Sequence, residues 1–144
     1  MPILNLAARA TLRPAHFSTL LLVLIGLAMS GITLSSREAS AAEVLNFEDQ
    51  PIIASLTTAE IKKGIMKAGM ARGWQVKETG PGELTATIHV RTHTATVAIS
   101  YNSKTYSIRY KDSTNLKYKN GKIHRNYNKW VNFLKTDIDR ELSF

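Results

Sequence analysis

The sequence predicts an α+β fold with element order α-β-β-β-β-α, in which a four-stranded antiparallel meander packs both helices on one face. Apolar residues follow a helical period in two separate stretches and a strand period of two in the stretch between them. The 144 residues leave room for one core. We expect residues 1–41 to be a signal peptide, 42–56 a lead or linker with a possible edge strand around Ile52–Ile53, and 57–144 a single α+β domain.

The first part of the chain has the pattern of an export signal. Residues 17–34 carry no charge, and Arg9 and Arg13 precede them on the side expected to stay in the cytoplasm. Small residues follow, and we expect cleavage between Ala41 and Ala42. An uncleaved anchor is the alternative, because this apolar helix would reach about 27 Å, close to the thickness of a hydrocarbon core. Cleavage predicts a periplasmic or secreted protein, and an anchor predicts a single-span inner-membrane protein.

A first helix is expected after the lead. Thr57 and Glu60 have capping-box spacing, and Gly73 suits the left-handed position just past the helix end. Gly64 and Gly69 weaken a helix, which predicts that another element packs closely there. The predicted core positions of this helix are Ile61, Ile65 and Ala68.

Residues 74–111 alternate apolar and polar side chains, which predicts the four strands. The expected turns are Gly80–Gly82, Thr92–His93 and Ser103–Lys104. The second turn would pair Ile88 with Val97, and the third would pair Ile99 with Ile108. Both pairings place apolar residues opposite each other on one face of the sheet.

The second helix is expected over residues 122–142. Its apolar stripe consists of Tyr127, Trp130, Val131, Leu134 and Ile138. We therefore expect Trp130 to be a core residue. Asp137, Asp139 and Glu141 fall on or beside the solvent face of this helix, whereas paired-carboxylate catalysis needs acids that converge in a cleft.

The charge favours anionic partners without choosing among them. The formal net charge is +8 and the pI is near 9.9, and most of this excess belongs to residues 42–144. The chain has no cysteine, which excludes disulfides, thiolate metal sites and a cysteine nucleophile.

The solvent face of the predicted sheet is the candidate anion-binding face. Its members are His89, Arg91, Arg109 and Lys111. Arginines among threonines on a flat sheet could bind a sulfated, phosphorylated or carboxylated polymer through charge-assisted hydrogen bonds. The alternative is an exposed face that uses threonine for strand propensity and charge for solubility.

Other chemistries find little support in the sequence. His89, His93 and His124 lack accompanying carboxylates, and nearby arginines would repel a metal ion, so we expect solvated histidines and no metal site. No G-x-S-x-G elbow surrounds the serines, and we expect no catalytic or cofactor-binding residues.

Interleaved aromatic and basic residues resemble a nucleic-acid platform, but Tyr106 and Tyr110 fall on the core side of their strand. We expect no nucleic-acid partner.

Two segments carry a resemblance to a known family, "ARGWQVKETGPGELTATIHVRTHTATV" and "YSIRYKDSTNLKYKNGKIHRNYNKWVNFLKTDI". With their G-W start, P-G turn, H-V-R-x-H tip and I-H-x-N-Y-N-x-W-V pattern, they resemble a family of small proteobacterial envelope proteins, many described as lipoproteins. The resemblance covers roughly residues 55–142 and implies an envelope location but no activity. Lipidation needs a cysteine at the end of a lipobox. Residues 29–32 resemble a lipobox but have Ile32 where the cysteine would stand, so we expect no lipid attachment.

These observations predict a non-catalytic exported envelope protein. Its expected partner is an anionic envelope polymer, a lipid head group or another envelope protein. The alternative is a signal-anchored inner-membrane structural or assembly factor, which would touch the membrane only through its uncleaved N-terminal segment.

Overall fold

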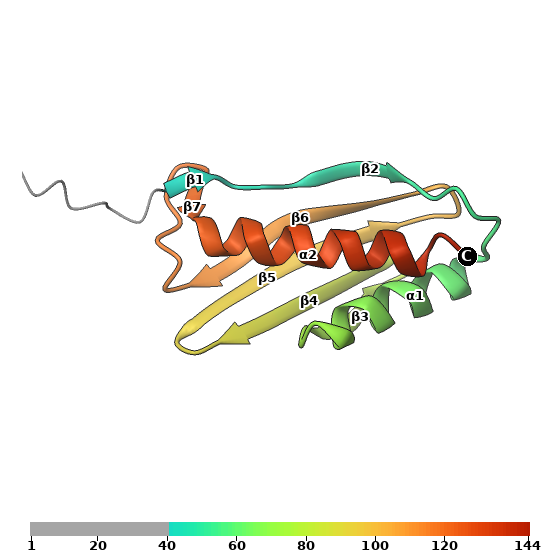
Figure 1. Cartoon of the computed structure of the whole chain (residues 1–144), viewed down its shortest axis with the longest axis horizontal. Coiled ribbons are helices and arrows are strands. Elements are labelled where there is room, and N and C mark those ends of the chain that lie inside the picture. The colour runs from blue at the N-terminus through green and yellow to red at the C-terminus, as the bar shows by residue number, and fades with distance from the viewer. Residues whose placement is uncertain (1–40) are drawn as a thin grey trace, which may run out of the picture. The chain divides into compact units, whose positions relative to one another are not determined.

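The computed structural model describes residues 41–144. The predicted signal segment, apart from its last residue Ala41, lies outside the described residues. The α+β class is confirmed. Two helices, α1 (Thr58–Ala71) and α2 (Arg125–Glu141), cover one face of an antiparallel sheet (Figure 1). The strands are β1 (Ala41–Glu43), β2 (Phe47–Pro51), β3 (Gln75–Gly80), β4 (Glu83–Val90), β5 (His93–Tyr101), β6 (Thr105–Thr114) and β7 (Lys122–His124).

The main sheet has five strands in the order β2-β6-β5-β4-β3, so the predicted four-stranded meander is wrong in its strand count. The additional strand, β2, pairs with β6 at the edge and lies before the Ile52–Ile53 position expected from sequence. A separate two-stranded sheet joins β1 to β7. Lys122–His124 therefore forms a strand, although we expected the first turn of a helix there, and its central residue Ile123 is fully buried.

The predicted register is correct for one of the two long hairpins and wrong for the other. In the β5–β6 hairpin, Ile99 lies opposite Ile108 as predicted. In the β4–β5 hairpin, Ile88 lies opposite Ala95 and not Val97, because the turn is formed by Arg91–Thr92. This shift by two residues keeps every side chain on its predicted face.

Helix α1 begins and ends as its sequence predicts. The Thr57 hydroxyl accepts from the Glu60 amide while Glu60 binds the Thr57 amide, and Gly73 takes a left-handed φ of 80° after the end of α1. A Cβ at Gly64 would lie 2.8 Å from Leu142 Cδ2, which confirms close packing between the helices.

The core lies between the sheet and the helices. The predicted core residues of α1 and α2 are buried, with the exception of Trp130. Trp130 is only partly buried, because it lies on the side of α2 that faces His93 at the tip of the β4–β5 hairpin, with ring centroids 6.5 Å apart. Trp74 is the buried tryptophan, at 2% exposure. Within the described residues, neither helix is long and apolar enough to cross a bilayer.

Candidate functional site

The predicted anion-binding face carries counter-charges. The Arg109 Nε donates to Glu48 Oε1 at 2.9 Å, and a second guanidinium nitrogen binds the other carboxylate oxygen. Glu48 belongs to β2, which lies just before the edge strand expected around Ile52–Ile53. Lys111 Nζ donates to Thr85 Oγ1 at 3.2 Å. The Arg109 guanidinium therefore already has a carboxylate partner.

The structure also separates the four predicted residues. Arg109 lies opposite Ala98, which lies opposite Thr85, near the middle of the sheet. Arg91 is in the hairpin turn, about 20 Å farther along β4 at 3.3 Å per residue. His89 lies between these positions, and its Nδ1 is 3.1 Å from Thr94 Oγ1. Arg109 and Lys111 are neighbours, but no compact ligand would reach Arg91 as well.

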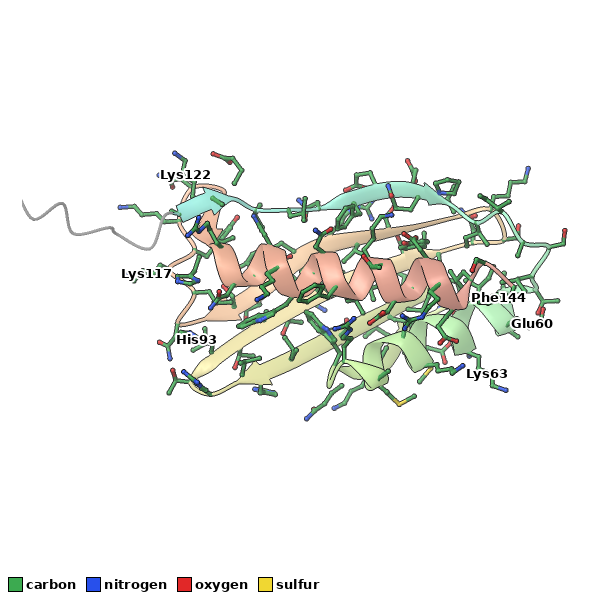
Figure 2. All side chains as sticks on the ribbon, viewed as in Figure 1. Glu60, Lys63, His93, Lys117, Lys122 and Phe144 are labelled. Carbon is green, nitrogen blue, oxygen red and sulfur yellow. The ribbon has the colours of Figure 1, made fainter. Side chains whose placement is uncertain are left out.

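A denser group of bases lies where the β4–β5 turn, the β6–β7 link and the start of α2 meet. We call this the basic end, and it consists of Arg91, His93, Lys117, Lys119, Lys122, His124 and Arg125. Figure 2 shows His93, Lys117 and Lys122 at the same end of the domain. Hydrogen bonds join its segments: Asn115 Nδ2 donates to the Thr92 carbonyl at 2.7 Å, and the His124 amide donates to the Leu116 carbonyl at 2.8 Å. All of its lysines and arginines are exposed, and among the described residues only Lys122 has an acidic neighbour, Glu43 Oε1 at 4.0 Å.

Backbone strain is concentrated at the basic end. Among the described residues, five non-glycine residues have positive φ, and four of them lie here: Arg91, Asn115, Lys117 and Asn120. Asparagine tolerates this conformation, but arginine and lysine do so only at a cost. Strained backbone tends to persist at functional positions, where the surrounding structure holds it in place.

The structure brings together two histidines that the sequence left apart. The His93 and His124 rings stack with centroids 6.4 Å apart. His93 Nδ1 lies 2.9 Å from the Asn115 carbonyl oxygen, so this nitrogen carries the hydrogen. His124 Nδ1 accepts from the Asn126 amide at 3.2 Å and caps α2, so its Nε2 carries the hydrogen. His124 therefore cannot offer Nε2 to a metal ion in this tautomer, and no group of three or more metal-ligating side chains occurs among the described residues.

A signal for the basic end was present in the sequence. No aspartate or glutamate occurs between Asp112 and Asp137, and this stretch supplies all of the basic end except the β4–β5 turn. The sequence alone shows the basic and aromatic residues of this stretch and its lack of acids. It could not show that Arg91 and His93 would join it, because that contact spans the β4–β5 and β6–β7 connections.

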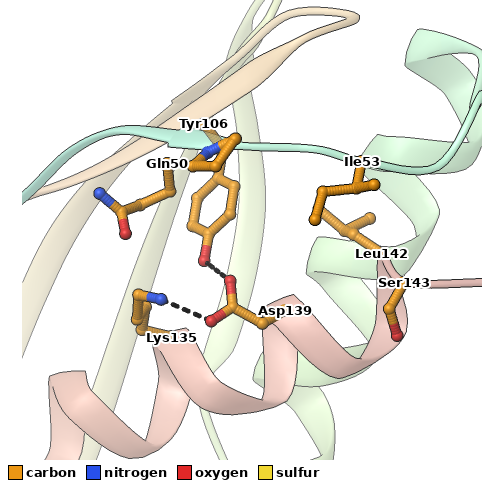
Figure 3. Close-up of a pocket in the computed structure, with 8 residues that line it drawn as sticks. Gln50, Ile53, Tyr106, Lys135, Asp139, Leu142 and Ser143 are labelled. Carbon is orange, nitrogen blue, oxygen red and sulfur yellow. Dashed lines mark hydrogen bonds and ion pairs between the residues drawn. The ribbon is translucent and has the colours of Figure 1, made fainter.

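A cavity of about 290 Å³ lies between the edge strand β2 and the C-terminal half of α2. Figure 3 shows that Tyr106 and Lys135 both point at the Asp139 carboxylate, and both hydrogen-bond to it. Burial raises the pKa of Tyr106 far above its ordinary value, and the hydrogen bond to Asp139 raises it further. The phenol stays protonated, and the carboxylate already has two partners.

Asp137 is buried, which corrects the expectation that it lies on or beside the solvent face of α2. Its side chain is 2% exposed, and it accepts from Arg72 at the end of α1 and from Arg140 Nη2 at 2.9 Å. The hydrogen bond from Arg72 lowers the pKa of Asp137, and Arg140 adds to the effect against the cost of burial. This ion pair joins the two helices.

We expect Asp137→Asn to lower the free energy of unfolding at pH 7 by about 1 to 3 kcal/mol, because Arg72 and Arg140 lose their charged partner. The lowered pKa means that this stabilisation is present above the unfolded-state value of about 3.9 and is lost as the pH falls through the folded-state pKa. Urea unfolding at pH 7 and at pH 3 should show the difference between wild type and variant shrinking in acid. Exposed Asp112→Asn serves as the control, and a difference independent of pH would contradict the prediction.

The expected cleavage bond lies inside β1. Ala41 pairs with His124, and Ala42 pairs with Ile123. The next carbonyl, that of Glu43, accepts from Asn128 Nδ2 at 2.8 Å. A chain that begins at Ala42 would therefore keep the pairing with Ile123 and the contact with α2.

No protein-family model, curated protein or solved structure matches this chain. The resemblance to envelope proteins remains a prediction.

Proposed function

We propose that the chain is a non-catalytic exported envelope protein whose basic end binds an anionic envelope component. The uncharged segment 17–34 and the small residues before Ala42 support export. The resemblance to envelope proteins points to the same compartment. The observation that carries the proposal is the acid-free stretch between Asp112 and Asp137, which folds against the β4–β5 turn into one exposed basic surface.

The positions of the charges support an anionic ligand. Arg125 lies in the first turn of α2, which contains no acid, so a positive side chain sits at the positive end of the helix dipole. Lys117 and Arg91 hold left-handed backbone conformations in the adjoining segments. An anion placed among these groups would relieve their mutual repulsion and accept charge-assisted hydrogen bonds.

The Asp139 cavity supports a non-catalytic role. General-base catalysis needs a group that is free to accept a proton, and nucleophilic catalysis needs a group with a free electron pair that can attack a substrate. Here Asp139 is bound by Tyr106 and Lys135, and Tyr106 stays protonated because of its raised pKa. We interpret this trio as a structural network that fastens α2 to β6.

The test uses the protein recovered from exporting cells, with its N-terminus read first, because a start at Ala42 separates the soluble form from the anchored alternative. The variant is Lys117→Gln, Lys122→Gln and Arg125→Gln combined. At about 1 kcal/mol per cation, or about 3 kcal/mol for the three together, we expect binding to dextran sulfate, a soluble polyanion, to weaken about 100-fold at low salt.

A sheet-face variant with the same change in net charge provides the matched control: Lys77→Gln, Arg109→Gln and Lys111→Gln combined. We expect it to bind nearly as wild type does, with both variants retaining their melting temperatures. If the sheet-face variant loses binding and the basic-end variant keeps it, the anion site lies on the face that the sequence predicted. If wild type shows no salt-sensitive retention, the proposed function is wrong.

A further inference from the structure

The outer side of α2 combines cations with an exposed aromatic ring. Its outward stripe consists of Lys129, Phe133, Thr136 and Arg140, which recur at helical spacing and are all exposed. Phe133 is 42% exposed. The Arg72 guanidinium carbon lies 4.9 Å from the centre of its ring, and Lys129 Nζ lies 5.8 Å from it. Cations therefore flank the exposed ring.

The outer side of α1 repeats this combination. Lys63, Lys67 and Met70 follow one another at helical spacing, and Met70 is 59% exposed. Met66 and Met70 line a shallow apolar groove together with the lysine side chains beside them. Lysine can cover an apolar surface with its methylenes while its ammonium reaches a charged or aqueous layer.

The acids of the helix layer are already engaged. Glu60 caps α1, Asp137 binds Arg72 and Arg140, and Glu141 pairs with Lys67 at 2.8 Å. Asp139, the remaining acid of α2, binds Lys135 on the flank. Residues 58–72 and 125–141, which form the helix layer, still contain eight lysines and arginines against four acids. On the open face of the sheet, Glu48 pairs with Arg109, and Glu83 lines the same hollow as Lys111. The helix layer is therefore the more cationic of the two faces.

We infer that this helix layer docks on an anionic lipid bilayer, with Phe133 and Met70 entering the head-group region and the neighbouring Lys129 and Lys63 binding lipid phosphates. This inference rests on the proposed function, because it assumes that the protein is exported to the envelope. The ligand here is an anionic lipid, and the surface that binds it is the helix layer and not the basic end. Single exposed apolar residues are ordinary on proteins, but here each is bordered by cations on the same helix face. A soluble polymer would satisfy the cations only. A bilayer also provides an apolar medium for the ring and the thioether.

The test is flotation of the exported protein with vesicles of 70% phosphatidylcholine and 30% phosphatidylglycerol, compared with pure phosphatidylcholine. Phosphatidylglycerol supplies the negative surface that attracts clustered lysines and arginines. We expect binding to the anionic vesicles that weakens with salt, and about tenfold weaker binding for Phe133→Ser with Met70→Ser. Ile53→Ser is the control, because Ile53 is 93% exposed but lies outside both stripes.

A second measurement reports insertion directly. In Phe133→Trp, we expect tryptophan fluorescence to shift to shorter wavelength when anionic vesicles are added, beyond any change in wild type. Equal binding to both vesicle types, or full binding by the double serine variant, would overturn the inference. If dextran sulfate is bound normally while vesicles are not, only this inference fails. If neither is bound, the proposed function fails with it.

Discussion

Tyr127→Ala is expected to lower the free energy of unfolding by about 3 to 5 kcal/mol, as for other large aromatic residues removed from a core. Tyr127 is fully buried in α2, and its ring meets that of Tyr110 edge-on, with centroids 5.5 Å apart. Tyr110 in turn stacks on Tyr118 of the β6–β7 link at 4.2 Å. Losing the Tyr127 ring would leave a cavity where α2, β6 and this link meet. Urea unfolding monitored by circular dichroism measures the change.

Two further variants show whether the ring or its hydroxyl matters. Within residues 41–144, the Tyr127 hydroxyl is buried without a hydrogen-bond partner. Tyr127→Phe should therefore keep the packing and raise stability by about 1 kcal/mol, since an unsatisfied buried polar group is removed. Trp130→Ala should cost less than Tyr127→Ala, because Trp130 is only partly buried. Equal costs for the two alanine variants would mean that Trp130 belongs to the core after all.

The faces of the sheet could be predicted because side-chain alternation has a period of two. Leu84, Ala86 and Ile88 are buried as expected, and the β5–β6 register follows from its short polar turn. The β4–β5 register could not be predicted in the same way. Pairing Ile88 with Ala95 or with Val97 places apolar residues opposite each other equally well. The turn that decides between them holds Arg91 at φ 56°, where glycine or asparagine would be the usual signal.

The missed strands depend on contacts distant in sequence. β2 contains Glu48, Asp49 and a bulge, and it is a strand because it pairs with the β6 edge. β7 continues the helical apolar pattern of α2, and it is a strand because β1 lies beside it. Local propensity is a weak guide for such short segments, where tertiary pairing decides. The same limit hid the ion pair of Arg109, since its partner Glu48 lies on β2, before the residues where an edge strand was expected.

The candidate surfaces were predictable in composition but not in placement. The sequence gives the number of cations and the absence of acids between Asp112 and Asp137. It does not reveal that Asp137 turns inward to Arg72, which leaves Phe133 bordered by cations on the outer side of α2. Helical periodicity places Phe133 outside the core stripe, but only the packing of α1 beside α2 brings Arg72 over its ring.

Gly69→Val is expected to lower the free energy of unfolding by about 2 to 3 kcal/mol, as for other overpacked cores. Gly69 is a buried residue of α1, and the sequence predicted close packing at this position. A Cβ placed there would lie 2.5 Å from Val76 Cγ2 and 3.6 Å from Trp74 Cβ. Val76 belongs to β3, so making room for the new side chain requires either a rotation of Val76 about its stiff χ1 bond or a movement of the helix or the edge strand.

Helix propensity opposes this effect, since valine is a better helix residue than glycine by a few tenths of a kcal/mol. A net loss of stability would show that the contact with β3 outweighs the gain. Ala71→Val is the control, because Ala71 is exposed on the same helix and should lose only about 0.6 kcal/mol in propensity. Thermal and urea unfolding of both variants measure the difference. If Gly69→Val were as stable as wild type, α1 would have to pack less closely on β3 than the structure places it.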